Sequence, residues 1–281
     1  MSLAQTIPCS PVRLSALDWL ALQSLVLWPH GVYLVERALD GSDDPLGLLA
    51  LAALAVFVAR QARELRLSPR LPWLSAAVVI TLAANTAWVL GAPALAAGVI
   101  AALALAGALA AWWPAQRPLA PLVGLLLLAL PLVASLQFYV GWPLRVFTAE
   151  ASALVLQAFG VDALRTGAAL QVSGRLLIVD APCSGVQMAW LGYFGACASA
   201  AWQALPDAAF VRRLPLVGAL VLAMNVLRNS VLVALEARPE GLSALAHQGI
   251  GLACLAALAV AVCALMQPTQ MLRSHHVALV A

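Results

Sequence analysis

Long apolar runs dominate this sequence, and they decide which solvent the chain can fold in. A helix that crosses a bilayer needs about 20 consecutive apolar residues. The 281-residue chain is 64% hydrophobic and only 10% charged, too apolar for a soluble domain of this size. The sequence therefore predicts an all-α polytopic membrane protein with eight transmembrane helices. The predicted spans are 17–36, 45–59, 71–91, 93–113, 119–139, 185–206, 214–235 and 248–266.

The positions of the arginines predict how these spans are oriented, because short cytoplasmic loops are enriched in positive charge. If the spans alternate in direction, the clusters of arginine fall on one side of the membrane. These clusters contain Arg60, Arg63, Arg66, Arg70, Arg117, Arg212, Arg213 and Arg273. We expect a multi-pass membrane protein with both termini in the cytoplasm. The net charge of +3 is too small to suggest a nucleic-acid partner.

The longest predicted loop, 137–182, falls on the outer side under this topology. Within it, residues 143–160 have apolar side chains at helical spacing, which predicts an amphipathic helix at the membrane interface. Residues 168–180 follow as two short β-like runs around Ser173 and Gly174. Such a pattern predicts a small β-hairpin just before the sixth span.

A cysteine stands at the outer end of the sixth span, in the sequence Pro-Cys-Ser-Gly at 182–185. A helix N-terminus favours negative charge, so a thiol there is biased toward the nucleophilic thiolate. Gly185 allows a tight turn, and Ser184 suits either an N-cap or a hydrogen-bond donor to an oxyanion. The alternative is that the four residues only end a strand and begin a helix. Cys183 is the one cysteine in an unusual setting, and no metal-ligand spacing accompanies it.

An arginine lies inside the seventh span, in the sequence Asn-Val-Leu-Arg-Asn at 225–229. Asn225, Arg228 and Asn229 are three and four residues apart, which predicts one shared helical face. A charge inside a span is costly unless it is paired or faces a wet cavity. The alternative is that Arg228 reaches the outer headgroups by itself.

His247 lies just before the eighth span, on the same side as Cys183 and Arg228. A cysteine, a histidine and an arginine together suit acyl transfer, as nucleophile, proton carrier and oxyanion stabiliser. Asp180 either orients His247 or Arg228, or is only a carboxylate at the end of a strand. A single histidine near an interface can also be incidental.

These motifs, in the order PCSG at 182–185, NVLR at 225–228 and the segment around His247, resemble the exosortase/archaeosortase family. That family consists of polytopic membrane cysteine proteases or transpeptidases. The resemblance covers 119–266 as a catalytic core within a single membrane domain, 1–281. It implies a catalytic set of Cys183, Arg228 and His247, supported by Ser184, Gly185, Asn225, Asn229 and Asp180. The proline before the cysteine departs from the family's usual pattern.

The resemblance also implies a substrate class. Its members act on exported proteins whose C-terminal sorting signal contains a recognition motif, a transmembrane helix and a basic tail, as in PEP-CTERM proteins. It further implies a location in the bacterial inner membrane and cleavage at the outer, periplasmic face through a thioester on Cys183, without a cofactor or a metal. The outer loop 137–182 would gate access of this membrane-anchored substrate, and the bilayer itself is the other expected partner.

Three alternatives remain open from the residues alone. In a transporter, Arg228, Asn225 and Asn229 would form a substrate site within the membrane. A membrane acyltransferase would use the same Cys183 nucleophile on a lipid substrate. In a structural subunit, the polar residues would only hold helices together.

Overall fold

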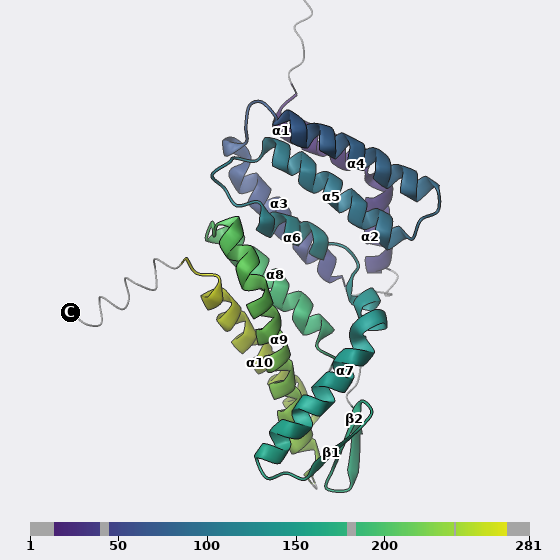
Figure 1. Ribbon diagram of the computed structural model, residues 1–281, viewed down its shortest axis with the longest axis vertical. Coiled ribbons are helices and arrows are strands. Elements are labelled where there is room, and N and C mark those ends of the chain that lie inside the picture. Colours follow the sequence, from purple (N-terminus) through teal and green to yellow (C-terminus); the bar gives the residue numbers. More distant parts are fainter. Residues whose placement is uncertain (1–13, 40–44, 179–183, 239, 269–281) are drawn as a thin grey trace, which may run out of the picture.

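The computed structural model describes residues 14–39, 45–178, 184–238 and 240–268 of the chain (Figure 1). Within these residues the protein forms ten α-helices and one small antiparallel sheet of three strands. The predicted class, an all-α membrane protein with a small β element before the helix that follows Cys183, is confirmed. Cys183 and Asp180 lie outside the described residues.

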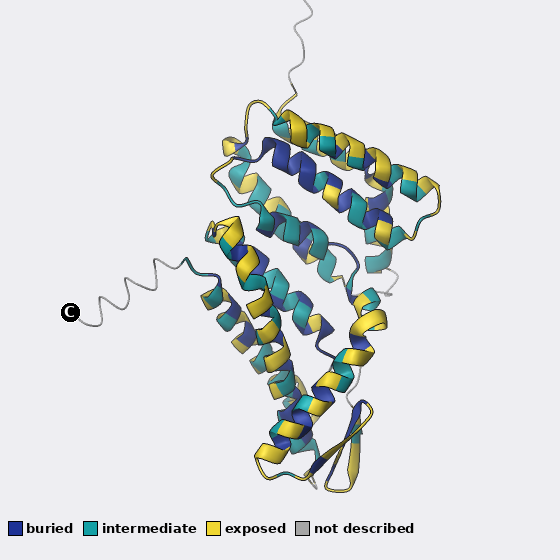
Figure 2. Ribbon diagram, viewed as in Figure 1, coloured by how far each residue is buried: buried dark blue, intermediate teal, exposed yellow. Residues whose placement is uncertain are grey.

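The first half of the chain forms five helices, and the fifth is the most buried of them (Figure 2). Its sequence is rich in alanine and glycine, so neighbouring backbones approach closely. A Cβ atom built on Gly107 would lie 3.4 Å from the Cβ of Ala77 in the preceding helix. The five helices are α1 (Ala16–Val26), α2 (Trp28–Leu39), α3 (Leu46–Gln61, followed by a short 3-10 turn at Ala62–Glu64), α4 (Leu71–Val89) and α5 (Ala94–Trp112).

The second half contains the helices that carry the predicted site. They are α6 (Ala120–Leu128), α7 (Val133–Ala158), α8 (Val186–Trp202), α9 (Asp207–Glu236) and α10 (Ala244–Leu265). Helices α8, α9 and α10 pack against one another, and α7 packs along α9. Buried apolar side chains from α6, α8, α9 and α10 form one continuous core, which includes Leu125, Ala196, Val221 and Leu258.

Five helices are long and apolar enough to cross a membrane, or six if a bent pair counts as one span, within the described residues. The prediction of eight spans therefore needs correction at three places. The run 17–36 is divided into α1 and α2, the run 119–139 is bent by 89° between α6 and α7, and α8 has 17 residues. Pro29 and Pro131 stand at the two breaks. Proline lacks an amide N–H and clashes with the preceding turn, so a helix ends before it.

Helix α7 joins two segments that the sequence pattern separates. The predicted end of the fifth span and the predicted interfacial helix at 143–160 form one helix of 26 residues. Its first half exposes large aromatic side chains, with Phe138 80% and Tyr139 76% exposed. Aromatic side chains of this kind suit the level of the lipid headgroups.

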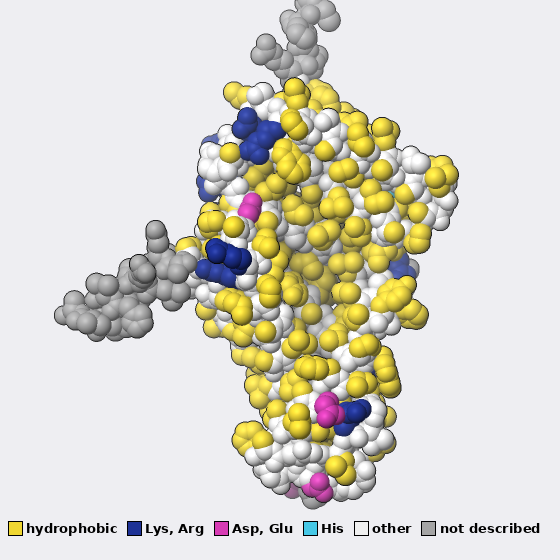
Figure 3. Space-filling view, viewed as in Figure 1, with side chains coloured by type: hydrophobic (Ala, Val, Ile, Leu, Met, Phe, Trp, Pro, Cys, Tyr) yellow, Lys and Arg dark blue, Asp and Glu magenta, His cyan; other side chains and the backbone are white. Residues whose placement is uncertain are grey.

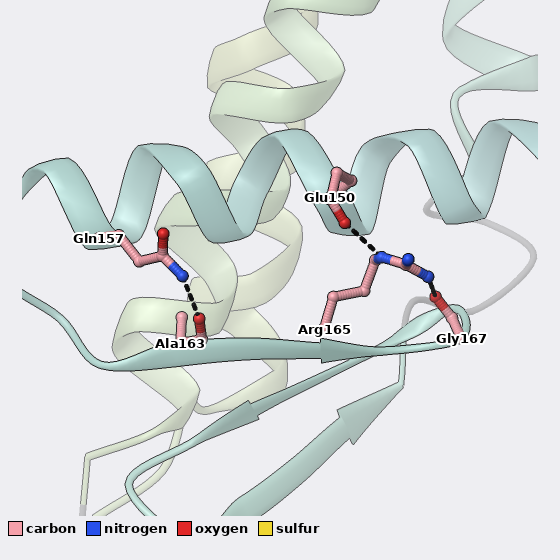
Figure 4. A network of polar contacts seen from close by, with 5 residues as sticks. All are labelled: Glu150, Gln157, Ala163, Arg165 and Gly167. Atoms are coloured by element: carbon pink, nitrogen blue, oxygen red, sulfur yellow. Dashed lines mark hydrogen bonds and ion pairs between the residues drawn. The ribbon is translucent and has the colours of Figure 1, made fainter.

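The small sheet has three strands rather than two: β1 (Ala163–Thr166), β2 (Ala169–Val172) and β3 (Arg175–Ile178). Its buried face, including Leu170 and Val172, packs against α7 and the end of α9. Polar contacts tie β1 to α7 as well: Arg165 bonds to Glu150, and Gln157 Nε2 donates to Ala163 O at 2.7 Å (Figure 4). The sheet is therefore fixed to α7 along two turns.

A second anchor joins the sheet to α9. The Nη1 atom of Arg175 in β3 donates to the carbonyl oxygen atoms of Arg238 at 3.0 Å and Glu236 at 3.4 Å. These carbonyls lie at the C-terminal end of α9, where the helix dipole favours a positive charge. The sheet therefore lies beside the end of α9.

The loops that are rich in arginine lie together at one end of the helices. Arg117 makes two hydrogen bonds to Glu64, of 2.8 and 2.9 Å. Asp207 Oδ1 accepts hydrogen bonds from the amides of Leu119 and Ala120, at 2.9 Å each. These contacts join the segments after α3, after α5 and after α8. The predicted topology places these arginine-rich segments on one side of the membrane, and their contacts agree with that. The assignment of this side to the cytoplasm stays a prediction.

Candidate functional site

The start of α8, the C-terminal part of α9 and the start of α10 lie together in the half of the molecule that contains the small sheet (Figure 1). Helix α8 begins at Val186, so Cys183 precedes its first residue by three positions. The described residues closest to Cys183 in the chain are Ser184 and Gly185, both of which are buried.

A cavity of about 470 Å³ opens between α8, α9 and α10 at this place. Arg228 is half-buried in it, and His247 is exposed at its rim. This volume lies in the range of ordinary ligand sites, about 300–1,000 Å³. The full lining is Gln187, Met188 and Leu191 of α8, Arg228 of α9, and His247, Gln248, Gly251, Leu252 and Leu255 of α10.

Arg228 and His247 share this cavity because a glycine lets the arginine lie close to α10. A Cβ atom built on Gly251 would lie 3.7 Å from Arg228 Nε. Gly251 and His247 are four residues apart, so they lie one above the other on the same face of α10. The structure thus brings together two of the three residues predicted to be catalytic, from helices that are separate in the sequence.

The two asparagines of α9 point elsewhere. Asn225 Nδ2 donates to Thr148 Oγ1 at 3.1 Å, and Asn229 Nδ2 donates to Ser152 Oγ at 3.0 Å. All four side chains are buried between α9 and α7. At about 100° per residue, Arg228 lies about 60° from Asn225 and 100° from Asn229 around the helix. The predicted shared face is therefore divided: the asparagines bind α7, and the arginine lines the cavity.

Gly185 brings the chain before α8 close to α9. Its φ angle is +88°, a left-handed conformation that favours glycine. A Cβ atom built on Gly185 would come within 2.9 Å of the side chain of Asn225. The turn after Cys183 thus requires a residue without a side chain, for conformation and for space.

Ser184 is held by both α7 and α8. Its hydroxyl donates to Gln137 Oε1 at 2.8 Å and accepts a hydrogen bond from the amide of Val186 at 3.3 Å. Only 2% of Ser184 is exposed. The N-cap residue of α8 is Gly185, so the predicted N-cap at Ser184 is displaced by one position. Because its proton is donated to Gln137, Ser184 acts here as part of the turn.

Sequence reasoning did not identify Gln137, Gln187 and Gln248 as parts of this region. Gln137 lies 47 residues before its partner Ser184, and a lone glutamine carries no motif. Gln187 and Gln248 lie beside the predicted residues in the chain, and both line the cavity. Thr148 and Ser152 of α7 were not identified either, although they have the same four-residue spacing as the two asparagines that bind them.

Within the described residues, no group of three histidine, cysteine, aspartate or glutamate side chains lies close enough to hold a metal ion. The polar atoms of the cavity come from an arginine, a histidine and two glutamines, above a floor of Met188, Leu191, Leu252 and Leu255. Such a site can bind a carbonyl or an anionic oxygen at Arg228 and exchange a proton at His247.

The fold and this cavity define a multi-pass membrane protein with an arginine and a histidine at one polar site near the ends of three helices. The family model of the transmembrane exosortases (Exosortase_EpsH) matches residues 38–265. The chain therefore belongs to the transmembrane exosortase family, as its motifs suggested. The match begins in α2 and includes α3 to α5, which the motifs alone did not cover. No curated protein and no solved structure matches the chain.

Proposed function

We propose that this exosortase is a membrane cysteine protease or transpeptidase that cleaves the C-terminal sorting tail of exported proteins. The observation that supports this most is the joint position of Arg228 and His247. Both line one cavity beside the first turn of α8, the helix that Cys183 precedes by three residues. Exosortases process PEP-CTERM proteins, so such a protein is the proposed substrate.

The proposed reaction begins when the Cys183 thiolate attacks the carbonyl carbon of the scissile peptide bond. Arg228 stabilises the negative charge that develops on the carbonyl oxygen. His247 takes the proton of the thiol and gives it to the leaving amine as the C–N bond breaks. A thioester on Cys183 results. Water then releases a free carboxylate, or a nucleophile of a surface acceptor takes the acyl group.

The lining of the cavity fits a substrate that arrives within the membrane. The polar atoms of Arg228, His247 and Gln187 stand above the apolar side chains of Leu191 and Leu255. The substrate has the same order of side chains, because its apolar transmembrane helix lies within the membrane and its polar recognition motif lies outside it. A substrate held by its own helix also diffuses in two dimensions, and its basic tail on the cytoplasmic side fixes the depth of the scissile bond.

The outer location of the site is part of this proposal. It is supported by the position of the arginine-rich segments, which include Arg117 and Arg212, at the opposite end of α8 and α9 from the cavity. We place those segments in the cytoplasm and the cavity at the periplasmic face of the inner membrane.

The contacts of the asparagines weigh against the transport alternative. That alternative needs Asn225, Asn229 and Arg228 at one substrate site. In the structure the two asparagines donate to Thr148 and Ser152 of α7 instead. The acyltransferase alternative keeps Cys183 as the nucleophile, and the identity of the trapped acyl group distinguishes it from the protease.

A test of the proposal uses the full-length enzyme co-expressed with a protein that carries a sorting tail. Replacing Cys183 by alanine should abolish cleavage while the enzyme stays in the membrane at its normal level. Cys263→Ala is the matched control, because Cys263 is exposed on α10, far along the helix from the cavity. Mass spectrometry of the wild-type enzyme should find the tail peptide as a thioester on Cys183. Undiminished cleavage by Cys183→Ala would refute the proposal, and a fatty acyl group on Cys183 would favour the acyltransferase.

A further inference from the structure

A second and larger cavity lies on another face of the molecule. It has a volume of about 610 Å³ and lies between α6, α8, α9 and the first turn of α4. The face over α6 and α9 is covered mainly by hydrophobic side chains and is hollowed between them (Figure 3). We call this cavity the α6 groove, because its wall includes Leu119, Val123 and Leu127, a complete stripe along α6.

The α6 groove presents apolar surface to whatever fills it. Its two most polar side chains already have partners in the protein. Asp207 accepts hydrogen bonds from the first amides of α6, and the Tyr193 hydroxyl donates to Leu214 O at 3.5 Å. A polar solute would find few groups to bind here. A hydrocarbon chain, by contrast, needs only contact with apolar side chains.

The length of the groove distinguishes a lipid from a protein helix. The lining stripe runs from Leu119 to Leu128, nine residue steps, which is about 14 Å of α-helix. One leaflet of a bilayer has a hydrocarbon thickness of about 15 Å, and a transmembrane helix needs about 30 Å. The groove therefore fits the acyl part of a lipid in a single leaflet and is too short for a spanning helix.

One end of the groove lies beside the arginine-rich segments. Trp73, which lines it, follows Arg70 by one turn of α4, and Val211, which also lines it, adjoins Arg212 in α9. Arginine side chains also appear on this face where α9 begins (Figure 3). The segments at this end carry seven arginines against two carboxylates: Arg60, Arg63, Arg66, Arg70, Arg117, Arg212 and Arg213 against Glu64 and Asp207. Such an excess attracts an anionic headgroup and repels a basic peptide tail.

The groove is also separate from the cavity at Arg228. On α8, Tyr193 and Cys197 face the groove, whereas Met188 and Leu191 face the cavity at Arg228. At about 100° per residue these two pairs lie on roughly opposite sides of the helix. A lipid in the groove would not compete with a substrate at Arg228.

We propose that the α6 groove is a binding site for one anionic phospholipid. Its acyl part fills the space between α6, α8 and α9, and its phosphate lies near Arg70 and Arg212. This inference does not depend on the chemistry at Cys183. Its occupant is a lipid of the leaflet that borders the arginine-rich segments, rather than the helix of a substrate.

Native mass spectrometry of the intact enzyme in mild detergent, with phosphatidylglycerol added, tests the proposal. The wild type should retain one phosphatidylglycerol and should prefer it to phosphatidylcholine. Val123→Phe fills the groove and should reduce the retained fraction by about tenfold or more. Val79→Phe is the matched control, since Val79 is 64% exposed on α4 and does not line the groove. Equal retention by the two variants would overturn the proposal.

A second variant keeps the test valid even if Val123→Phe does not fold. Arg70→Gln combined with Arg212→Gln changes only the proposed headgroup contacts. It should remove the preference for phosphatidylglycerol over phosphatidylcholine, whereas Arg63→Gln, in the same loop as Arg70, should keep it. An unchanged preference in the double variant overturns the proposal. So does a photoreactive amino acid at Leu127 that captures a membrane protein instead of lipid.

Discussion

The Ser184 hydroxyl donates a hydrogen bond of 2.8 Å to Gln137 Oε1. Gln137 belongs to α7, the helix that follows the 89° bend, and Ser184 is the residue directly after Cys183. Ser184 is also bonded to the first amide of α8. The residue next to the proposed nucleophile is therefore fixed from two helices. We therefore predict that Gln137 acts as a positioning residue for Cys183.

Replacing Gln137 by alanine should slow cleavage of the sorting tail by about three- to tenfold, the worth of one such hydrogen bond. The loss should be in kcat rather than in KM, because Gln137 holds Ser184 and does not line the cavity. Gln137→Glu, which keeps an acceptor oxygen, should recover part of the rate. The measurement is cleavage over a range of substrate concentrations, together with the rate of Cys183 alkylation.

Gln203→Ala is the matched control for this prediction. Gln203 follows α8 at its other end and donates to Ser199 Oγ at 2.8 Å. The control should cleave and alkylate like the wild type. If Gln137→Ala alkylates at the wild-type rate and only KM rises, Gln137 does not position the cysteine.

Gly185→Ala should destabilise the protein and lower activity together. An L-residue in the left-handed conformation costs about 1–2 kcal/mol, and the added methyl group would meet Asn225 at 2.9 Å. Thermal unfolding in detergent should show a lower melting temperature. Gly249→Ala, with nothing within 4 Å of the new Cβ atom, should melt at or slightly above the wild-type temperature. Equal melting temperatures for the two variants would contradict the tight turn.

Arg228→Gln should reduce cleavage by about 100-fold or more, as for the loss of an oxyanion-stabilising group. Arg228→Lys should recover little, because an ammonium group lacks the planar fork of donors that a guanidinium offers. Single-turnover cleavage measures both variants. Arg63→Lys, in the exposed loop after α3, is the control and should be normal. Full recovery by lysine would show that charge alone suffices.

The pairing of Asn229 with Ser152 should appear as a coupling energy between α9 and α7. Double-mutant cycles for polar pairs within membranes average about 0.6 kcal/mol. The cycle consists of Asn229→Leu, Ser152→Ala and the double variant, each measured by unfolding in detergent. Asn229→Leu with Leu258→Ala serves as the uncoupled comparison, and its two effects should add. A coupling energy of zero for Asn229 and Ser152 would show that this contact does not stabilise the packing of α7 on α9.

Composition and apolar runs sufficed to predict the class of fold, because the overall hydrophobicity of a chain decides whether it folds in lipid or in water. The cores of α3, α4, α5 and α10 follow the predicted runs closely. The number of straight spans could not be read in the same way. Pro29 and Pro131 break two runs that are continuous in hydropathy, and a window average does not register the missing amide of a single proline.

The sequence predicted those site residues whose type is unusual for their position, and it did not predict those whose type is ordinary there. An arginine inside an apolar run stands out, and so Arg228 and its approach to His247 were expected from the sequence. The partners of the asparagines, Thr148 and Ser152, are ordinary residues of a helix. Their role follows from the packing of α7 on α9, which no local pattern records.

Helix α7 has attachments at both ends and in its middle. Gln157 and Glu150 connect it to the sheet, Thr148 and Ser152 to α9, and Gln137 to the turn before α8. From Gln157 to Gln137 the helix extends about 30 Å. One helix thus carries the sheet, the asparagine contacts and the turn at Ser184, so these three parts of the molecule share a common frame.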